Sequence, residues 1–280
     1  MHRKARPRQA DGRKKAGMMA VIDRSKFFEK AKAGVKKAFQ KRDIQLIQAV
    51  RCMDDLDSAK SLMYTRLMEW FKLNFPEFDL ANEETACAVI AEFGAKELFS
   101  EQKLAEIVGA PKAKELMQKA RDSYGAEFTA DDQKTVKKLA EGVLSLFTAR
   151  KNVEEFVQKE GQATLRNLSY LTDPLLASRL VTIAGGLARL AKMPGSTIQV
   201  IGAEKALFKH LRKGTKPPKH GILFQSPLVR GSPLEERGRI ARTLAAKLTI
   251  AAKADYFTGN FIAEKLKEGL DKRLKEIKAG

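Results

Sequence analysis

Apolar side chains recur at seven-residue intervals over the first third of the chain, between about Ser25 and Pro76. They follow two adjacent tracks: Leu46, Met53 and Leu67, interrupted by Lys60, and beside them Ala49, Leu56, Met63 and Trp70. Two such tracks are typical of a long helix with a coiled-coil seam. The helix is predicted to end near Pro76, which has no backbone N–H to continue it.

A second long helix is predicted from Thr129 to about Gly161. Thr129 is its expected N-cap. Asp131 and Asp132 stand in the first turn, where the helix dipole favours anions. The apolar stripe of this helix comprises Leu139, Val143, Leu146, Val153 and Val157.

Residues 80–125 lie between the two long helices and predict shorter ones. Asn82 marks one expected helix start, and Gly109-Ala110-Pro111 marks a break. With such a connector, the two long helices predict an antiparallel coiled coil. An ordinary helical bundle that uses the same apolar stripes is the alternative.

Beyond residue 170 the chain becomes rich in Ala and Leu, which predicts tightly packed helices. A turn-rich linker at 213–233 precedes an amphipathic helix that Gly259 is expected to end, and a charged helix follows. No strand–helix–strand alternation is visible. The sequence therefore predicts an all-α fold, with two long helices forming a coiled coil and a compact helical C-terminal domain. The expected division is a disordered basic arm at 1–25, a coiled-coil region at 26–166 and a C-terminal domain at 167–280.

Charge is unevenly distributed along this pattern. In total, 53 Lys and Arg against 34 Asp and Glu give a formal net charge of +19. Residues 1–42 carry 15 bases and 3 acids, a net +12, and residues 192–247 carry 12 bases and 3 acids, a net +9. Two basic blocks around a near-neutral middle indicate surfaces that bind polyanions. A solvated tail and a charged helix face are the alternative.

Several classes of protein are excluded by what the sequence lacks. No apolar run approaches the roughly 20 residues that span a bilayer, so we expect no membrane contact and a cytoplasmic, intracellular protein. Cys52 and Cys87 stand in helical sequence and are expected to be small core residues. With three scattered histidines, they predict no metal site. No Gly-rich cofactor loop or nucleophile–base arrangement is visible, so we expect no cofactor and no enzymatic activity.

The second basic block has a defined organisation. Gly202 predicts a turn and a helix start, after which Lys205, Lys209 and Lys213 recur every four residues and share one face. The start of that helix offers free backbone N–H groups to a phosphate. Like charges on one face repel one another unless an anion lies against them. This face is therefore predicted to be exposed, with Leu207 and Leu211 facing inward.

The linker and the next helix add further cations. Lys216, Pro217, Pro218, Lys219 and His220 place two ammonium groups and an imidazole on a stiff segment. Gln225 can contact a base edge or a phosphate, and arginines bind phosphates through two N–H groups at once. The three that open the following helix are Arg237, Arg239 and Arg242. Together these residues predict a basic wall suited to the phosphates of a shaped RNA duplex.

The same segment resembles the Nop domain. The resemblance rests on three blocks in order: GAEKALF at 202–208, which adds Ala203 and Glu204 to the candidate set, KPPKHG at 216–221 and FQSPL at 224–228. RGRIARTLAAKL at 237–248 and DYFTG at 255–259 are similar to the closing helix of this family. RDIQLIQAV at 42–50 and the sequence to residue 79 resemble its first coiled-coil helix. The resemblance covers about residues 40–260.

This resemblance implies a scaffold of a box C/D-type ribonucleoprotein. Its Nop domain would recognise a kink-turn RNA that already holds a small kink-turn-binding protein related to ribosomal proteins. The particle would carry out RNA-guided 2′-O-methylation, as in archaea. A homodimer would form through the coiled coil, with the following residues as candidates for its interface: Leu56, Met63, Leu67, Leu139, Val143 and Leu146.

The chain departs from the family pattern at two places. Members carry a globular domain that holds fibrillarin before the first coiled-coil helix, whereas about forty mostly basic residues stand here. The fibrillarin-binding surface is therefore expected to be missing, and fibrillarin is left open as a partner. LRNLSYLTDPLLASRL at 165–180 replaces the usual Pro-Asn and Gly-rich run. A Nop-domain protein without a methylation role, as in the splicing-factor branch, and a nonspecific basic nucleic-acid-binding protein are the alternative functions.

Overall fold

The computed structural model describes residues 24–279, and in this range the chain forms fourteen α-helices and no strand. The all-α prediction is therefore confirmed. The chain divides into two units, one up to Gln40 and one from Lys41 onward. The first unit contains helix α1 (Arg24–Phe39), which exposes four large apolar side chains: Phe27, Phe28, Val35 and Phe39. Residues 1–23 of the predicted basic arm lie outside the described residues.

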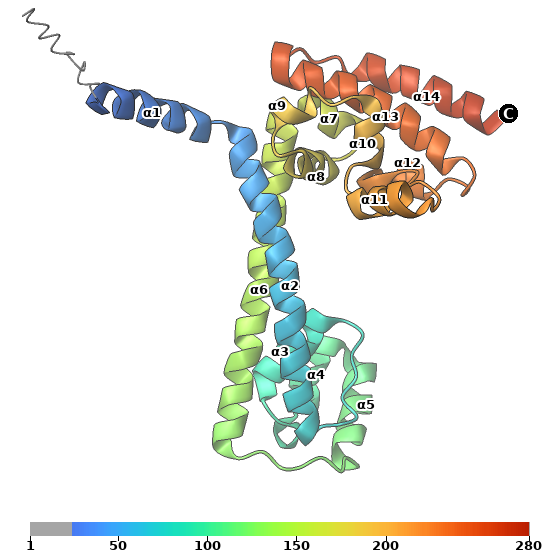
Figure 1. Ribbon diagram of the computed structural model, residues 1–280. Coiled ribbons are helices and arrows are strands. Elements are labelled where there is room, and N and C mark those ends of the chain that lie inside the picture. Colours follow the sequence, from blue (N-terminus) through green and yellow to red (C-terminus); the bar gives the residue numbers. More distant parts are fainter. Residues whose placement is uncertain (1–23, 280) are drawn as a thin grey trace, which may run out of the picture. The chain divides into compact units, whose positions relative to one another are not determined.

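The second unit is organised around two long antiparallel helices, α2 (Arg42–Asn74) and α6 (Ala130–Thr164), which lie side by side (Figure 1). The predicted end of α2 and the predicted start of α6 are confirmed, whereas α6 continues past Gly161 to Thr164, and the helical stretch predicted from about Ser25 is interrupted between α1 and α2. Helix α2 ends two residues before Pro76. Thr129 caps α6: its hydroxyl accepts from the Asp132 N–H (3.2 Å), while the Asp132 carboxylate accepts from the Thr129 N–H (3.0 Å). These reciprocal bonds satisfy donors that a helix start otherwise leaves unpaired.

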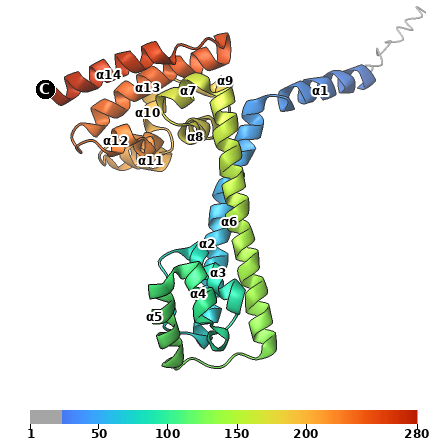
Figure 2. The ribbon, with the colours of Figure 1, turned by 180° about the vertical axis from the view of Figure 1, so that it is seen from behind.

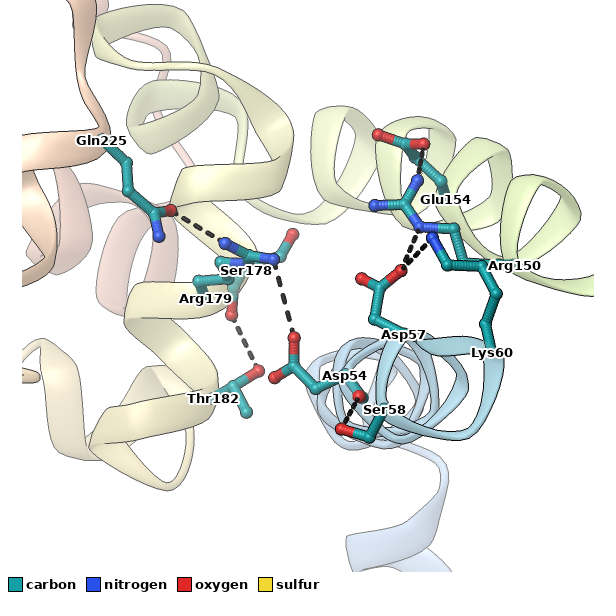
Figure 3. A network of polar contacts seen from close by, with 10 residues as sticks. All are labelled: Asp54, Asp57, Ser58, Lys60, Arg150, Glu154, Ser178, Arg179, Thr182 and Gln225. Carbon is teal, nitrogen blue, oxygen red and sulfur yellow. Dashed lines mark hydrogen bonds and ion pairs between the residues drawn. The ribbon is translucent and has the colours of Figure 1, made fainter. Parts of the chain in front are cut away.

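The first predicted apolar track forms the seam between α2 and α6. Leu46, Met53 and Leu67 are fully buried, whereas the second track is half-buried and ends at Trp70, which is 37% exposed. Ion pairs at the polar edges of the seam fix the alignment of α2 along α6. Arg42 Nε donates to Glu160 Oε2 at 2.9 Å near one end. Arg150 Nε donates to Asp57 Oδ1 at 3.1 Å near the middle (Figure 3).

A small helical lobe covers the C-terminal half of α2 and the N-terminal half of α6. It consists of α3 (Glu83–Phe93), the 3₁₀ turn η1 (Lys96–Leu98), α4 (Glu101–Val108) and α5 (Ala110–Arg121). Asn82 caps α3 and Gly109 separates α4 from α5, as predicted. The core holds five phenylalanines, and aromatic rings in edge and tilted contacts stabilise it: Phe71, Phe75, Phe78, Phe93 and Phe99.

The C-terminal lobe packs at the other end of the helix pair and has its own core (Figure 2). The bounds are α7 (Arg166–Leu171), α8 (Pro174–Ala184), α9 (Leu187–Leu190), α10 (Gly195–Val200), α11 (Glu204–Lys213), η2 (Gly221–Gln225), α12 (Pro227–Arg230), α13 (Arg237–Lys253), the π turn η3 (Ala254–Thr258) and α14 (Ala263–Ala279). The long helix of this lobe, α13, is continued by the π turn η3, and this turn ends at the predicted Gly259, which has φ 68°.

One polar clamp holds α7, η3 and the start of α14 together. Asp255 accepts from the backbone N–H groups of Asn167 (2.9 Å) and Leu168 (3.0 Å) and from Asn167 Nδ2 (2.7 Å). Asn167, only 1% exposed, also donates to Asn260 O (2.9 Å) and accepts from Ile262 N–H (2.7 Å). Asn167 belongs to the segment that departs from the family pattern, and its four hydrogen bonds join that segment to η3 and to the chain that precedes α14.

Two of the six residues expected at a dimer interface are buried in the interior of the single chain. Leu67 and Val143 are at most 1% exposed within the core of the small lobe, and the other four candidates are half-buried. A second copy could reach Leu67 and Val143 only if this core opened. Their role in dimerisation stays a prediction, and the exposed face of α2 offers Leu62 (59% exposed) and Leu73 (62% exposed) instead.

The two cysteines differ, against the expectation that both are core residues. Cys87 is buried in the small lobe, whereas Cys52 is exposed on α2. The seam residue at this point is Met53, and its neighbour in sequence necessarily points elsewhere on a helix. None of the described helices is long and apolar enough to cross a membrane. Within residues 24–279, no three His, Cys, Asp or Glu side chains are arranged to hold a metal ion.

The folded chain should consume one equivalent of iodoacetamide at pH 8.5, at Cys52. Burial, followed by the charges of Glu83 and Glu84, raises the pKa of the Cys87 thiol to about 12. Since the thiolate is the nucleophile, this pKa lowers its reactive fraction by about 10³-fold relative to an ordinary thiol. Mass spectrometry would locate the label, and urea should expose the second site. Equal labelling of both cysteines without urea would contradict the packing of the small lobe.

Candidate nucleic-acid interface

The first residues of the GAEKALF block, Gly202 to Glu204, form the turn at which α11 begins. Gly202 has φ 80°, a conformation that favours glycine. Its N–H donates to Glu204 Oε1 at 2.8 Å, and the Ala203 N–H donates to Val200 O at 3.0 Å. These bonds turn the chain sharply after α10, so Gly202, Ala203 and Glu204 set the direction in which α11 leaves the lobe.

Helix α11 presents its lysines as predicted. Lys205, Lys209 and Lys213 are all exposed, and no ion pair joins any of them to an acid in the part of the chain that the structure describes. Since α-helical neighbours lie three and four residues apart, the three ammonium groups follow one face. The prediction of an exposed lysine face is confirmed.

The prediction that Leu211 faces inward is wrong. Leu211 is 69% exposed, and Phe208 is 58% exposed beside it, while Leu207 is only half-buried. No residue of α11 is buried. Only Leu207 and His210 of this short helix are half-buried, so the side of α11 that faces the lobe passes through these two residues and not through Leu211. Cationic and apolar side chains therefore share its solvent-facing surface.

The linker at 216–221 is held against the end of α10. A Cβ atom on Gly221 (φ 42°) would lie 2.2 Å from Ile201 O, so only glycine fits this close approach. The Ile222 N–H donates to Ile201 O at 2.8 Å. Gln199 Nε2 donates to Lys219 O at 2.7 Å. The linker is thus fixed by its backbone, which leaves the side chains of Lys216 and Lys219 exposed.

His220 belongs to a ring stack at the end of the linker. Its imidazole stacks on Phe224 at 4.9 Å between centroids, and the Arg237 guanidinium lies 5.3 Å from the Phe224 ring centroid. Burial, then the Arg237 and Lys219 cations, lower the pKa of His220 below its usual range. The imidazole is therefore neutral at pH 7 and offers a hydrogen bond rather than a charge.

Arg237 differs from the other two predicted arginines. Its Nε donates to Ser232 O at 2.9 Å and its Nη2 to Arg230 O at 3.3 Å. These bonds brace the chain between α12 and α13 and leave Arg237 fewer free N–H groups. Arg239 and Arg242 are exposed instead.

The structure brings the linker and the arginine helix together around one cavity of about 410 Å³. It is lined by Gln199, Lys216, Pro217, Pro218, Lys219, Glu235, Gly238, Arg239 and Arg242. Four cations against one carboxylate make this cavity strongly basic. It can hold phosphate oxygens through ammonium and guanidinium N–H groups. The lysines of α11 do not line it, so they form a separate part of the basic surface.

Gln225 is fixed by a residue that sequence reasoning missed. Its Oε1 accepts from Arg179 Nη1 at 3.0 Å, and Arg179 Nη2 lies 3.5 Å from Asp54 Oδ1 on α2 (Figure 3). Arg179 thus joins α8, the long helix pair and η2. The only available signal was a single arginine within an Ala- and Leu-rich helix. The pairing with Gln225 leaves the Gln225 amide N–H₂ for a ligand.

Comparison with known proteins shows which family this sequence matches. The family model "Nop: snoRNA binding domain, fibrillarin" matches residues 52–276. An uncharacterised NOP5 family protein of Methanocaldococcus jannaschii is 42% identical over 252 residues, covering 89% of this chain and 61% of the relative. Nucleolar protein 58 of Candida albicans is 35% identical over 225 residues, covering 80% of this chain and 44% of the relative.

Among solved structures, a chain in the crystal structure of a fibrillarin/Nop5p complex shares the fold, with a TM-score of 0.50 and 23% identity. The match covers 91% of this chain and 77% of that one. This chain spans about two fifths to three fifths of the length of the curated relatives cited above. Since the family model covers most of the sequence, the chain belongs to the Nop family.

Proposed function

We propose that this chain is a non-catalytic RNA-binding scaffold of a box C/D-type ribonucleoprotein. In this proposal it recognises a kink-turn RNA together with a small kink-turn-binding protein, in RNA-guided 2′-O-methylation. The basic cavity between the linker and α13 carries the proposal. Its cations are held on a backbone that is already fixed, so little freedom is lost on binding. It stands within a family described as snoRNA-binding.

The surface of α11 supports recognition of RNA and protein together. Its three lysines suit phosphates, which fix orientation without reading sequence. Phe208 and Leu211, exposed on the same short helix, suit an apolar patch on a protein partner. A ligand made of RNA alone would leave these apolar side chains in water. A composite of RNA and a small bound protein would cover both kinds of group.

The long helices supply the proposed homodimer contact. We place that contact on the half-buried candidates Leu56, Met63, Leu139 and Leu146, with the exposed Leu62 and Leu73 beside them. Leu67 and Val143 are buried within the core of the small lobe, so their part in the contact would need this core to open. We assign no fibrillarin contact to the described residues, so fibrillarin remains open as a partner. The chain itself would position the RNA and its partner proteins and would not catalyse the methylation.

A competition measurement tests the proposal. The full chain would be bound to a kink-turn RNA holding its small partner protein, and challenged with random duplex RNA of equal length at fixed salt. Specific recognition should favour the kink-turn complex by on the order of 10³-fold. Binding by charge alone would favour neither, because that term depends on phosphates and not on shape. Equal competition would overturn the proposal and leave a nonspecific polyanion-binding protein.

A further inference from the structure

A second basic cavity lies between the two last long helices of the C-terminal lobe, α13 and α14. Its volume is about 250 Å³, and its lining is Arg239, Arg242, Thr243, Arg273, Glu276 and Ile277. The two helices pack closely through a shared core, so the cavity is held open between rigid elements. Three guanidinium groups on rigid helices are an arrangement suited to phosphate, which each can bind through two N–H groups.

The charge in this cavity is largely uncompensated. Arg239 and Arg242 have no acidic partner among residues 24–279. Arg273 Nη1 lies 2.5 Å from Glu276 Oε2, but these side chains are 61% and 46% exposed. An exposed pair three residues apart is weak, so an arriving phosphate can compete with the carboxylate. Three cations against one anion leave the cavity with a net charge of +2.

This cavity adjoins the one at the linker, because Arg239 and Arg242 line both. The basic surface therefore continues from Lys216 and Lys219, across α13, to Arg273 on α14. A single small anion would occupy only one part of such a track. A ligand with evenly repeated phosphates can occupy the whole track, and an RNA strand is such a ligand.

We propose that the α13–α14 cavity is a second phosphate-binding site, which takes the backbone of the RNA stem that leads away from the region held at the linker. Arg273 would be its outermost contact, and Glu276 would weaken it by competing for Arg273. The site rests on the proposed RNA-binding function and extends it. It predicts that RNA affinity depends on stem length, because only a longer stem reaches α14.

The test compares Arg273→Gln with Lys275→Gln, which removes the same charge from an exposed position of α14 outside the cavity. The probes are one kink-turn RNA with a short stem and the same RNA with a stem extended by one helical turn. Affinities would be measured against salt concentration. Arg273→Gln should weaken binding of the long RNA by about tenfold at 0.1 M salt and lower the salt slope by about one. Binding of the short RNA, and the effect of Lys275→Gln, should change less than twofold.

Glu276→Gln should change RNA affinity in the direction opposite to Arg273→Gln. It frees Arg273 and removes a repulsive carboxylate, so it should strengthen binding of the long RNA by several-fold. A merely structural role of the pair would produce a loss instead. If Arg273→Gln and Glu276→Gln leave the long RNA unaffected while the wild-type chain still prefers kink-turn RNA, this site is overturned and the proposed function stands. If the wild-type chain shows no such preference, the proposed function itself fails.

Discussion

Replacing Lys205, Lys209 and Lys213 together by glutamine should weaken RNA binding by about 10²- to 10³-fold at 0.1 M monovalent salt. Each phosphate contact releases about one counterion, so each lost contact lowers affinity by about tenfold at this salt concentration. The effect should nearly vanish at 1 M salt. Glutamine has a helix propensity close to that of lysine, and α11 buries none of its residues, so the fold should be unchanged.

A matched variant controls for net charge. Lys114, Lys134 and Lys138 are exposed in or beside the small lobe and carry no ion pair among the described residues. Replacing these three by glutamine removes the same three charges far along the chain from α11. This variant should lose less than about threefold in affinity at 0.1 M salt. If both triple variants lose affinity equally, the lysine face of α11 is no specific contact, and only overall charge attracts the RNA.

The parts of the fold that sequence reasoning predicted are those governed by neighbouring residues. A helix start at Thr129 depends on a side chain three positions away, and a helix end before Pro76 depends on the ring of one residue. The buried track of Leu46, Met53 and Leu67 follows from a repeat that one helix carries by itself. Such features can be predicted from one helix alone, without knowing which other helix packs against it.

The candidate site was predictable in its composition but not in its contacts. Sequence spacing placed Lys205, Lys209 and Lys213 on one exposed face, because this depends only on helix geometry. It could not predict that Arg237 is hydrogen-bonded within the chain while Arg239 is exposed, since the carbonyls that accept from Arg237 come from the turn that precedes α13. It also missed Arg179, whose partners lie 46 residues ahead and 125 residues behind it. Long-range pairs of this kind follow from tertiary packing, which no local pattern encodes.

The orientation of Leu211 was missed for a related reason. An apolar residue four positions after Leu207 ordinarily faces the same neighbour as Leu207 does. Here only Leu207 and His210 of α11 are half-buried, so the contact of this short helix with the lobe passes through them and leaves Leu211 exposed. An apolar side chain that a helix leaves in water at a basic surface is better explained by an external partner.

The clamp between Asn167 and Asp255 should be the most sensitive polar point of the C-terminal lobe. Asp255→Ala should lower the free energy of unfolding of this lobe by about 3 kcal/mol, because it leaves three buried or half-buried N–H donors without their acceptor. Asn167→Ala should cost a similar amount, since it strands the Asn260 carbonyl and the Ile262 N–H. The double variant should cost less than the sum of the two, because they share a hydrogen bond.

Two probes can assign this loss to the C-terminal lobe. The single tryptophan, Trp70, lies on the part of α2 that carries the small lobe, so its fluorescence reports on that lobe during urea unfolding. Amide hydrogen exchange in α7 and α13 reports on the C-terminal core. Asp255→Ala should speed exchange in α7 and α13 strongly while shifting the Trp70 transition much less, because the two lobes have separate cores. Asp271→Ala, at a partly exposed position of α14, should cost less than about 0.5 kcal/mol. A cost of Asp255→Ala no greater than that of this control would show that the clamp does not hold the lobe together.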